Sequence, residues 1–96
     1  MTDTLPTLRQ RELLNEVVSD ALVEIRHLCR LKLSEQAEDL ADAMHNIPRA
    51  IHGWGRWSWD LTEGLAAEYN ARWAGSESPP MFDYSARINS IRGAAA

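Results

Sequence analysis

Residues 53–59, with the sequence GWGRWSW, decide how this chain folds. Three of the four tryptophans of the protein fall within this short stretch. A long amphipathic segment follows it, and a segment that contains Pro48 precedes it. Because aromatic side chains bury more apolar surface than any others, we expect the hydrophobic core to be built around this bend.

The bend also decides how many helices the second half of the chain forms. Apolar residues keep helical spacing across it, which would suit one helix over 48–74. However, Gly53 and Gly55 each cost about 1 kcal/mol in a helix interior, and Ser58 is followed by Asp60, a pattern typical of a helix N-terminus. The sequence therefore predicts a break or kink within the bend.

The predicted helix after the bend, over 58–74, has two different faces. Large apolar side chains recur on one face at a spacing of four residues: Leu61, Leu65, Tyr69 and Trp73. Small residues form the opposite flank: Gly64, Ala67, Ala71 and Ala74. We expect the large face to pack into the bundle and the small flank to let another backbone approach closely.

Upstream of the bend, the spacing predicts a long helix over 7–31. Placed at 100° per residue, its apolar side chains cover an arc about 180° wide: Leu13, Leu14, Val17, Val18, Ala21, Leu22, Ile25, Leu28, Cys29 and Leu31. Cys29 is therefore expected to face the core as a small apolar residue. Glu24 is the one carboxylate inside the arc.

A second helix is predicted over 35–47, with Ser34 as its N-cap and Pro48 ending or kinking it at Ile47. The short connection makes the first two helices an antiparallel hairpin. After Gly75, a Pro-containing linker over 76–80 leads to a short helix over about 83–92.

The expected fold is all-α: a small helical bundle built on an antiparallel helical hairpin, with a third helix and a short C-terminal helix. Residues 1–75 would form the bundle domain, and 76–96 a linker with a short C-terminal helix or a flexible tail. If ordered, this tail must dock, either on the small flank of helix 58–74 or on a second protomer.

Composition narrows the classes of function. The net charge of −4, from 14 acidic and 10 basic residues, makes nucleic acid an unlikely partner, since phosphate binding needs clustered positive charge. A nucleic-acid surface would have to combine Arg26, Arg30 and Lys32 with Arg49 or Arg56. No apolar run is long enough to cross a bilayer. The start of the chain does not resemble a signal peptide and there is a single cysteine, so we expect a cytoplasmic protein.

Two carboxylate-x-x-His pairs resemble metal-binding patterns of helical bundles: Glu24 with His27, and Asp42 with His45. Asp42 lies nearly opposite the apolar stripe of its helix, which is the wrong side for a site in the bundle core. His45 and His52 flank Pro48 and would suit a zinc site or an acid/base pair, but half-buried histidines that bond to the backbone are the simpler interpretation. We predict neither metal nor cofactor.

Glu24 lies on an apolar arc, where a carboxylate either meets a cation or has a raised pKa. A structural ion pair is the preferred interpretation, and the candidate partners are Arg49, Arg56 and Arg72. The alternative is that Glu24 joins His45 and His52 in a pocket at the bend.

The candidate binding residues lie at the bend: Trp54, Arg56, Trp57 and Trp59, with His45 and His52. They would suit an aromatic platform for a ligand, or a protein-binding surface, because exposed Trp and Arg are frequent in such surfaces. The competing interpretation makes Trp54 and Trp57 core residues that continue the stripe of helix 58–74.

Taken together, the sequence predicts a non-enzymatic protein-interaction domain, plausibly a homodimer, that presents helix 58–74 and the bend to a protein partner. One alternative is a small ligand-binding protein or enzyme with a pocket formed by Glu24, His45 and His52. Another is an antitoxin or immunity-type protein that neutralises a basic protein, which the acidic balance would suit. No phosphate-binding loop, CxxC or EF-hand pattern is present.

Overall fold

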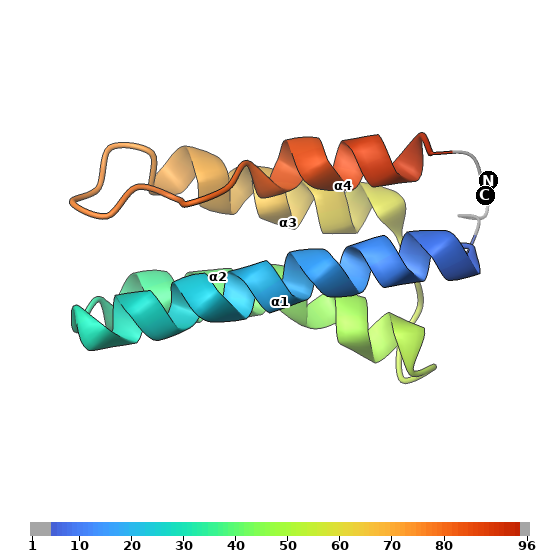
Figure 1. Ribbon diagram of the computed structural model, residues 1–96, viewed down its shortest axis with the longest axis horizontal. Helices are drawn as coiled ribbons and strands as arrows, with labels where there is room; N and C mark the ends of the chain where they lie inside the picture. Colours follow the sequence, from blue (N-terminus) through green and yellow to red (C-terminus); the bar gives the residue numbers. More distant parts are fainter. Residues whose placement is uncertain (1–4, 95–96) are drawn as a thin grey trace.

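A computed structural model describes residues 5–94, which form four α-helices (Figure 1). They are α1 (Leu8–Arg30), α2 (Ser34–Ile51), α3 (Trp59–Arg72) and α4 (Tyr84–Arg92). Successive helices run in opposite directions, each packs on the next, and α4 returns to α1. The result is an up-and-down four-helix bundle of 38 × 22 × 21 Å. This confirms the prediction of a small all-α bundle built on the α1–α2 hairpin.

Local hydrogen bonds and backbone geometry define the start of α1 and the turn between α1 and α2. Thr7 and Gln10 form a reciprocal capping box, which satisfies N–H groups that the first turn leaves unpaired. Lys32 turns the chain with a φ of 61°, and Leu33 N–H donates to the Leu28 carbonyl at 2.9 Å. Leu33, not Ser34, holds the N-cap position of α2 and makes no side-chain cap bond.

Pro48 does not end the second helix, so of the two outcomes predicted at Ile47, an end or a kink, the end is wrong. α2 continues to Ile51, and the Pro48 carbonyl accepts a hydrogen bond from the His52 N–H at 3.0 Å. Proline removes one donor but keeps its carbonyl, so the next turn can form on it. Ile47, the residue before Pro48, is fully buried.

The predicted break at the bend is confirmed. Gly53 adopts a φ of +77°, a conformation that glycine reaches without the steric cost of a side chain. The chain then crosses to α3, where the Ser58 hydroxyl accepts a hydrogen bond from the Leu61 N–H at 3.1 Å. Residues 48–74 are therefore not one helix.

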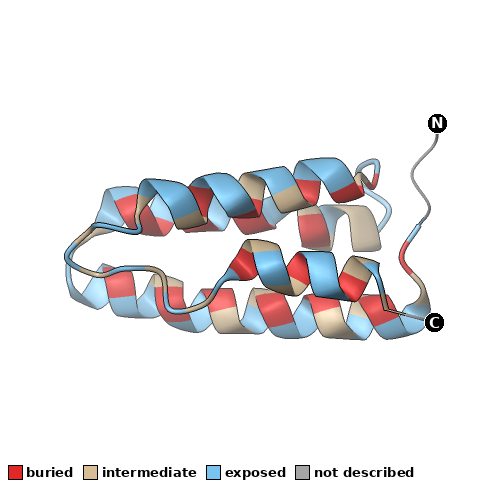
Figure 2. Ribbon diagram, turned by 90° about the horizontal axis from the view of Figure 1, so that it is seen from above, coloured by how far each residue is buried: buried red, intermediate tan, exposed pale blue. Residues whose placement is uncertain are grey.

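Only part of the predicted apolar arc of α1 is buried (Figure 2). Leu14, Val17 and Leu28 are completely covered, whereas Leu22 is 59% exposed. Cys29 is exposed as well, so its predicted place in the core is wrong. α1 packs against α2 and α4, and these two neighbours cover a narrower arc than the apolar pattern spans.

The helix α4 belongs to the same core as the hairpin. Tyr84 and Ile88 are fully buried among residues from α1, α2 and α3. The small flank of α3 is exposed along its whole length, so α4 does not dock there. It packs instead on α1 and on another side of α3. Leu61, expected on the buried face of α3, is 50% exposed, while Thr62 and Ala66 are fully buried.

Candidate functional site

The bend separates two buried tryptophans from an exposed one. Trp57 and Trp59 are 7% and 5% exposed, and their rings meet edge to face with centroids 4.9 Å apart. Trp54 is 73% exposed, so the interpretation that made it a core residue is wrong. Trp54 lies in the chain between the end of α2 and the two buried tryptophans.

A ring contact and a hydrogen bond order the loop around Trp54. The His52 ring lies 5.5 Å from the Trp54 ring, and the Arg49 Nη2 atom donates to the Trp54 carbonyl at 3.5 Å. Arg56 is exposed on the same loop. Residues 46–59 contain two arginines, a histidine and no acid. The segment 46–59, which includes the bend, is thus basic and rich in aromatic residues, although the whole protein has a net charge of −4.

A second polar centre lies at the other end of the bundle, around Glu24. This side chain is only 1% exposed. Its carboxylate accepts hydrogen bonds from the Tyr69 hydroxyl at 2.5 Å, from the Tyr84 hydroxyl at 2.5 Å and from the Met81 N–H at 3.0 Å. α1 is thereby joined to α3, to α4 and to the linker 73–83.

Gln36 completes this centre from α2. Its side-chain amide donates to the Tyr69 hydroxyl at 3.1 Å and to the Ser78 carbonyl at 2.7 Å. Burial raises the pKa of Tyr69 and Tyr84 far above the ordinary value of 10.0, and the hydrogen bonds to Glu24 raise the pKa further. Burial disfavours the charged phenolate. Both phenols therefore keep their protons, and remain hydrogen-bond donors, at neutral pH.

The arginine partners predicted for Glu24 are wrong. Its partners are both tyrosines of the chain and a backbone amide. Arg72 pairs instead with Glu35 and Asp39 at 2.8 and 2.7 Å. The apolar arc did identify Glu24 as a buried carboxylate in need of donors, but nothing in the local sequence pointed to two tyrosines 45 and 60 residues away.

The structure does not bring Glu24 together with His45 and His52. Glu24 lies at the level of Gln36, because both bond to Tyr69. At 1.5 Å per residue, His45 is about 13 Å and His52 about 24 Å further along α2. Both histidines are exposed. Within residues 5–94, no three His, Cys, Asp or Glu side chains are grouped so that they could hold a metal ion.

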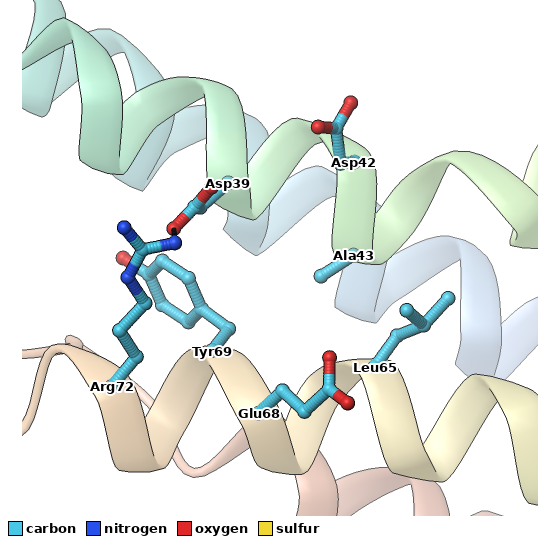
Figure 3. Close-up of a pocket in the computed structure, with 7 residues that line it drawn as sticks. All are labelled: Asp39, Asp42, Ala43, Leu65, Glu68, Tyr69 and Arg72. Carbon is cyan, nitrogen blue, oxygen red and sulfur yellow. Dashed lines mark ion pairs between the residues drawn. The ribbon is translucent and has the colours of Figure 1, made fainter.

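A shallow groove of about 150 Å³ runs between α2 and α3 (Figure 3). Arg72 and Asp39 form an ion pair at one end of it. Asp42 on α2 and Glu68 on α3 also line it, and both are exposed. With three carboxylates and one guanidinium, the groove is acidic, and Ala43, Leu65 and Tyr69 complete its lining.

The basic residues that a nucleic-acid surface would need are divided between the two ends of the bundle. Arg26, Arg30 and Lys32 lie where α1 ends, and Arg49 and Arg56 lie where α2 ends, at the opposite end (Figure 1).

No helix within the described range is long and apolar enough to cross a membrane. Comparison of the chain with protein-family models, curated proteins and solved structures found no match.

Proposed function

We propose that this protein is a non-enzymatic helical interaction domain and that Trp54 anchors its protein partner. The observation that carries the proposal is the exposure of Trp54, 73%, on a loop whose next two tryptophans are buried. Apolar surface left in water is unfavourable by about 25 cal/mol per Å². Tryptophan is also enriched among the residues that dominate protein–protein affinity. A partner that covers this ring would recover that free energy.

The surroundings of Trp54 favour a partner of a definite chemistry. Arg49, His52 and Arg56 surround it in sequence and no acid lies between residues 46 and 59. Leu61, in the first turn of α3, is half-exposed and adds an apolar side chain on the helix that follows the bend. An apolar pocket rimmed by carboxylates would complement this surface in shape and in charge.

The test is affinity capture from the cells that make the protein, with three baits. The wild type should retain a partner that the Trp54→Ala bait loses. A Leu31→Ala bait, which truncates a half-exposed apolar residue at the other end of the bundle, should retain it. The complex should then be reconstituted from purified components and its affinity measured. Retention of the same partner by Trp54→Ala would contradict the proposal.

A second candidate, neutralisation of a basic protein, is favoured by the acidic groove between α2 and α3. A lysine or arginine of the target would lie between Asp42 and Glu68, which have no ion-pair partner among residues 5–94. Asp42→Lys with Glu68→Lys should then abolish binding while Trp54→Ala leaves it intact. Adding this double variant to the three baits therefore separates the two candidates.

A further inference from the structure

The outer face of α1 is not covered by the rest of the bundle. α1 packs against α2 and α4, and its opposite side keeps three large apolar side chains in solvent. Leu8 is 74% exposed, and Leu22 and Val23 are each 59% exposed. Two of these three lie near the middle of the helix, which has 23 residues.

Apart from Arg9 at its edge, the exposed charged residues of this face are separated by sign along the helix. Glu12 and Glu16 lie in the N-terminal half, and Arg26 and Arg30 lie in the C-terminal half; all four are exposed. At 100° per residue, they fall within an arc of about 80°. Glu12 pairs with Arg9 at 3.2 Å, and the other three have no ion pair within residues 5–94.

We propose that two copies of this chain form a dimer through the outer faces of α1, packed antiparallel. The two-fold axis lies at the level of Ala21, with Glu12 nine residues before it and Arg30 nine residues after it. Glu12 of each copy therefore faces Arg30 of the other copy. The axis also pairs Glu16 with Arg26 of the second copy, five residues to either side. The axis repeats both pairs, so opposite charges meet at both ends of the contact.

The charge pattern selects this orientation. Parallel packing of the same faces would oppose Glu12 to Glu12 and Arg30 to Arg30, and like charges that face each other are destabilising. In the antiparallel dimer, Leu22 and Val23 of both copies meet beside the axis. The contact then has an apolar centre and a charged rim, as protein interfaces commonly do.

The length of α1 suits such a contact. With 23 residues, α1 is about 34 Å long, close to the 38 Å length of the whole molecule. Exposed ion pairs are screened by salt, so the dimer should dissociate as the salt concentration rises. This dimer goes beyond the proposed function because it uses a different surface from Trp54.

The test is the solution mass by sedimentation equilibrium at low salt, at concentrations up to the millimolar range. The wild type should reach twice the mass of the chain and should revert to a monomer in high salt. Glu12→Arg with Glu16→Arg should weaken the dimer by about tenfold or more, and Arg26→Glu with Arg30→Glu should do the same. All four changes in one chain restore the complementary pattern and should restore the dimer.

A matched control changes charge elsewhere. Glu38→Arg with Asp42→Arg alters the net charge as much as the first pair, on exposed positions of α2, and should leave the dimer intact. Circular dichroism of each variant shows that any monomer is folded. A wild type that stays monomeric at low salt would overturn the proposal, and so would a dimer indifferent to the charge reversals. Trp54→Ala should not change the mass, so the two proposals can fail separately.

Discussion

The two ends of the bundle are held together by different interactions. At the linker end, Glu24 accepts three hydrogen bonds that join α1 to Tyr69, Tyr84 and Met81. At the bend end, two tryptophans pack edge to face, and the buried indole nitrogen of Trp57 has no partner among the described residues. At the first end the buried hydrogen bonds converge on one carboxylate. At the second end aromatic packing adds to separate hydrogen bonds, such as that from the Gln10 side-chain amide to the Ile91 carbonyl at 3.1 Å.

This difference has a consequence for function. A hydrogen-bonded centre tolerates little change, because a donor that loses its buried acceptor costs about 1 to 3 kcal/mol. Aromatic packing stabilises the bend through Trp57 and Trp59, whereas the Trp54 side chain on the loop before them is exposed. Loss of the Trp54 ring should therefore cost the fold little.

The largest expected effect tests the linker end. Glu24→Ala removes the acceptor of two buried phenols and a backbone amide, so we expect the free energy of unfolding to fall by about 3 to 6 kcal/mol. For a domain with a stability of about 5 to 15 kcal/mol, this loss could prevent folding. Urea unfolding followed by circular dichroism measures it.

A matched control uses another glutamate of the same helix. Glu16 is exposed, and Glu16→Ala should change the stability of the folded chain by no more than about 0.5 kcal/mol. Glu24→Gln, which keeps an acceptor oxygen, should fall between the two. Equal stability of the Glu24→Ala and Glu16→Ala variants would show that the carboxylate does not hold the linker end.

The next effect tests the bend end. Trp57→Ala empties a volume in the core and should lower the free energy of unfolding by about 3 to 5 kcal/mol. Trp57→Phe keeps an aromatic ring and removes the unpaired N–H, so it should cost much less. Thermal unfolding of both variants measures the difference. If Trp57→Phe were as damaging as Trp57→Ala, the indole N–H would have a bonding role that the present structure does not show.

A smaller effect, confined to high pH, again concerns the linker end. Because the pKa of Tyr69 and Tyr84 is raised above the ordinary 10.0, the unfolded chain loses phenolic protons before the folded one does. Stability is then fully present below pH 10.0 and falls as the pH rises through the raised pKa. Between pH 10.0 and the raised pKa, each phenol lowers the free energy of unfolding by about 1.4 kcal/mol per pH unit. Urea unfolding at about pH 9, 10 and 11 measures the slope.

Tyr84→Phe provides the comparison for this slope. It removes one of the two phenols, so about half of the alkaline slope should disappear, although the variant starts from a lower stability at neutral pH. An unchanged slope would mean that other groups control alkaline unfolding.

The helices were predictable because local chemistry sets them. The Ser58 hydroxyl caps α3 as expected, Asp83 caps α4, and Gly53 breaks the chain where its spacing alone would have continued a helix. The wrong predictions concern features that depend on how the helices pack against one another. α2 continues past Pro48, whose carbonyl still accepts the hydrogen bond of the next turn. Cys29 is exposed because the arc of α1 that is covered depends on where α2 and α4 pack.

The sites were predictable only in part for the same reason. An apolar pattern identifies Glu24 as buried, but its tyrosine partners lie on helices whose approach no local pattern encodes. The tryptophans at the bend illustrate this too: helical spacing treats Trp54 and Trp57 alike, but both lie in the break between α2 and α3, where only Trp57 is buried. A turn of a few residues thus converts a core candidate into a surface residue.

The smallest expected effect on stability is also the clearest test of how the bend end of the bundle differs from the linker end. Trp54→Ala should change the free energy of unfolding by no more than about 0.5 kcal/mol, although the same substitution at Trp57 should nearly unfold the domain. Thermal unfolding of the two variants side by side measures the contrast, and Trp54→Ala should also remove the fluorescence of a solvent-exposed indole. A loss of more than about 2 kcal/mol would mean that the loop packs on the bundle and that the bend holds the fold together. An unchanged stability would leave Trp54 a residue exposed without structural need, and that is what an anchor for a partner requires.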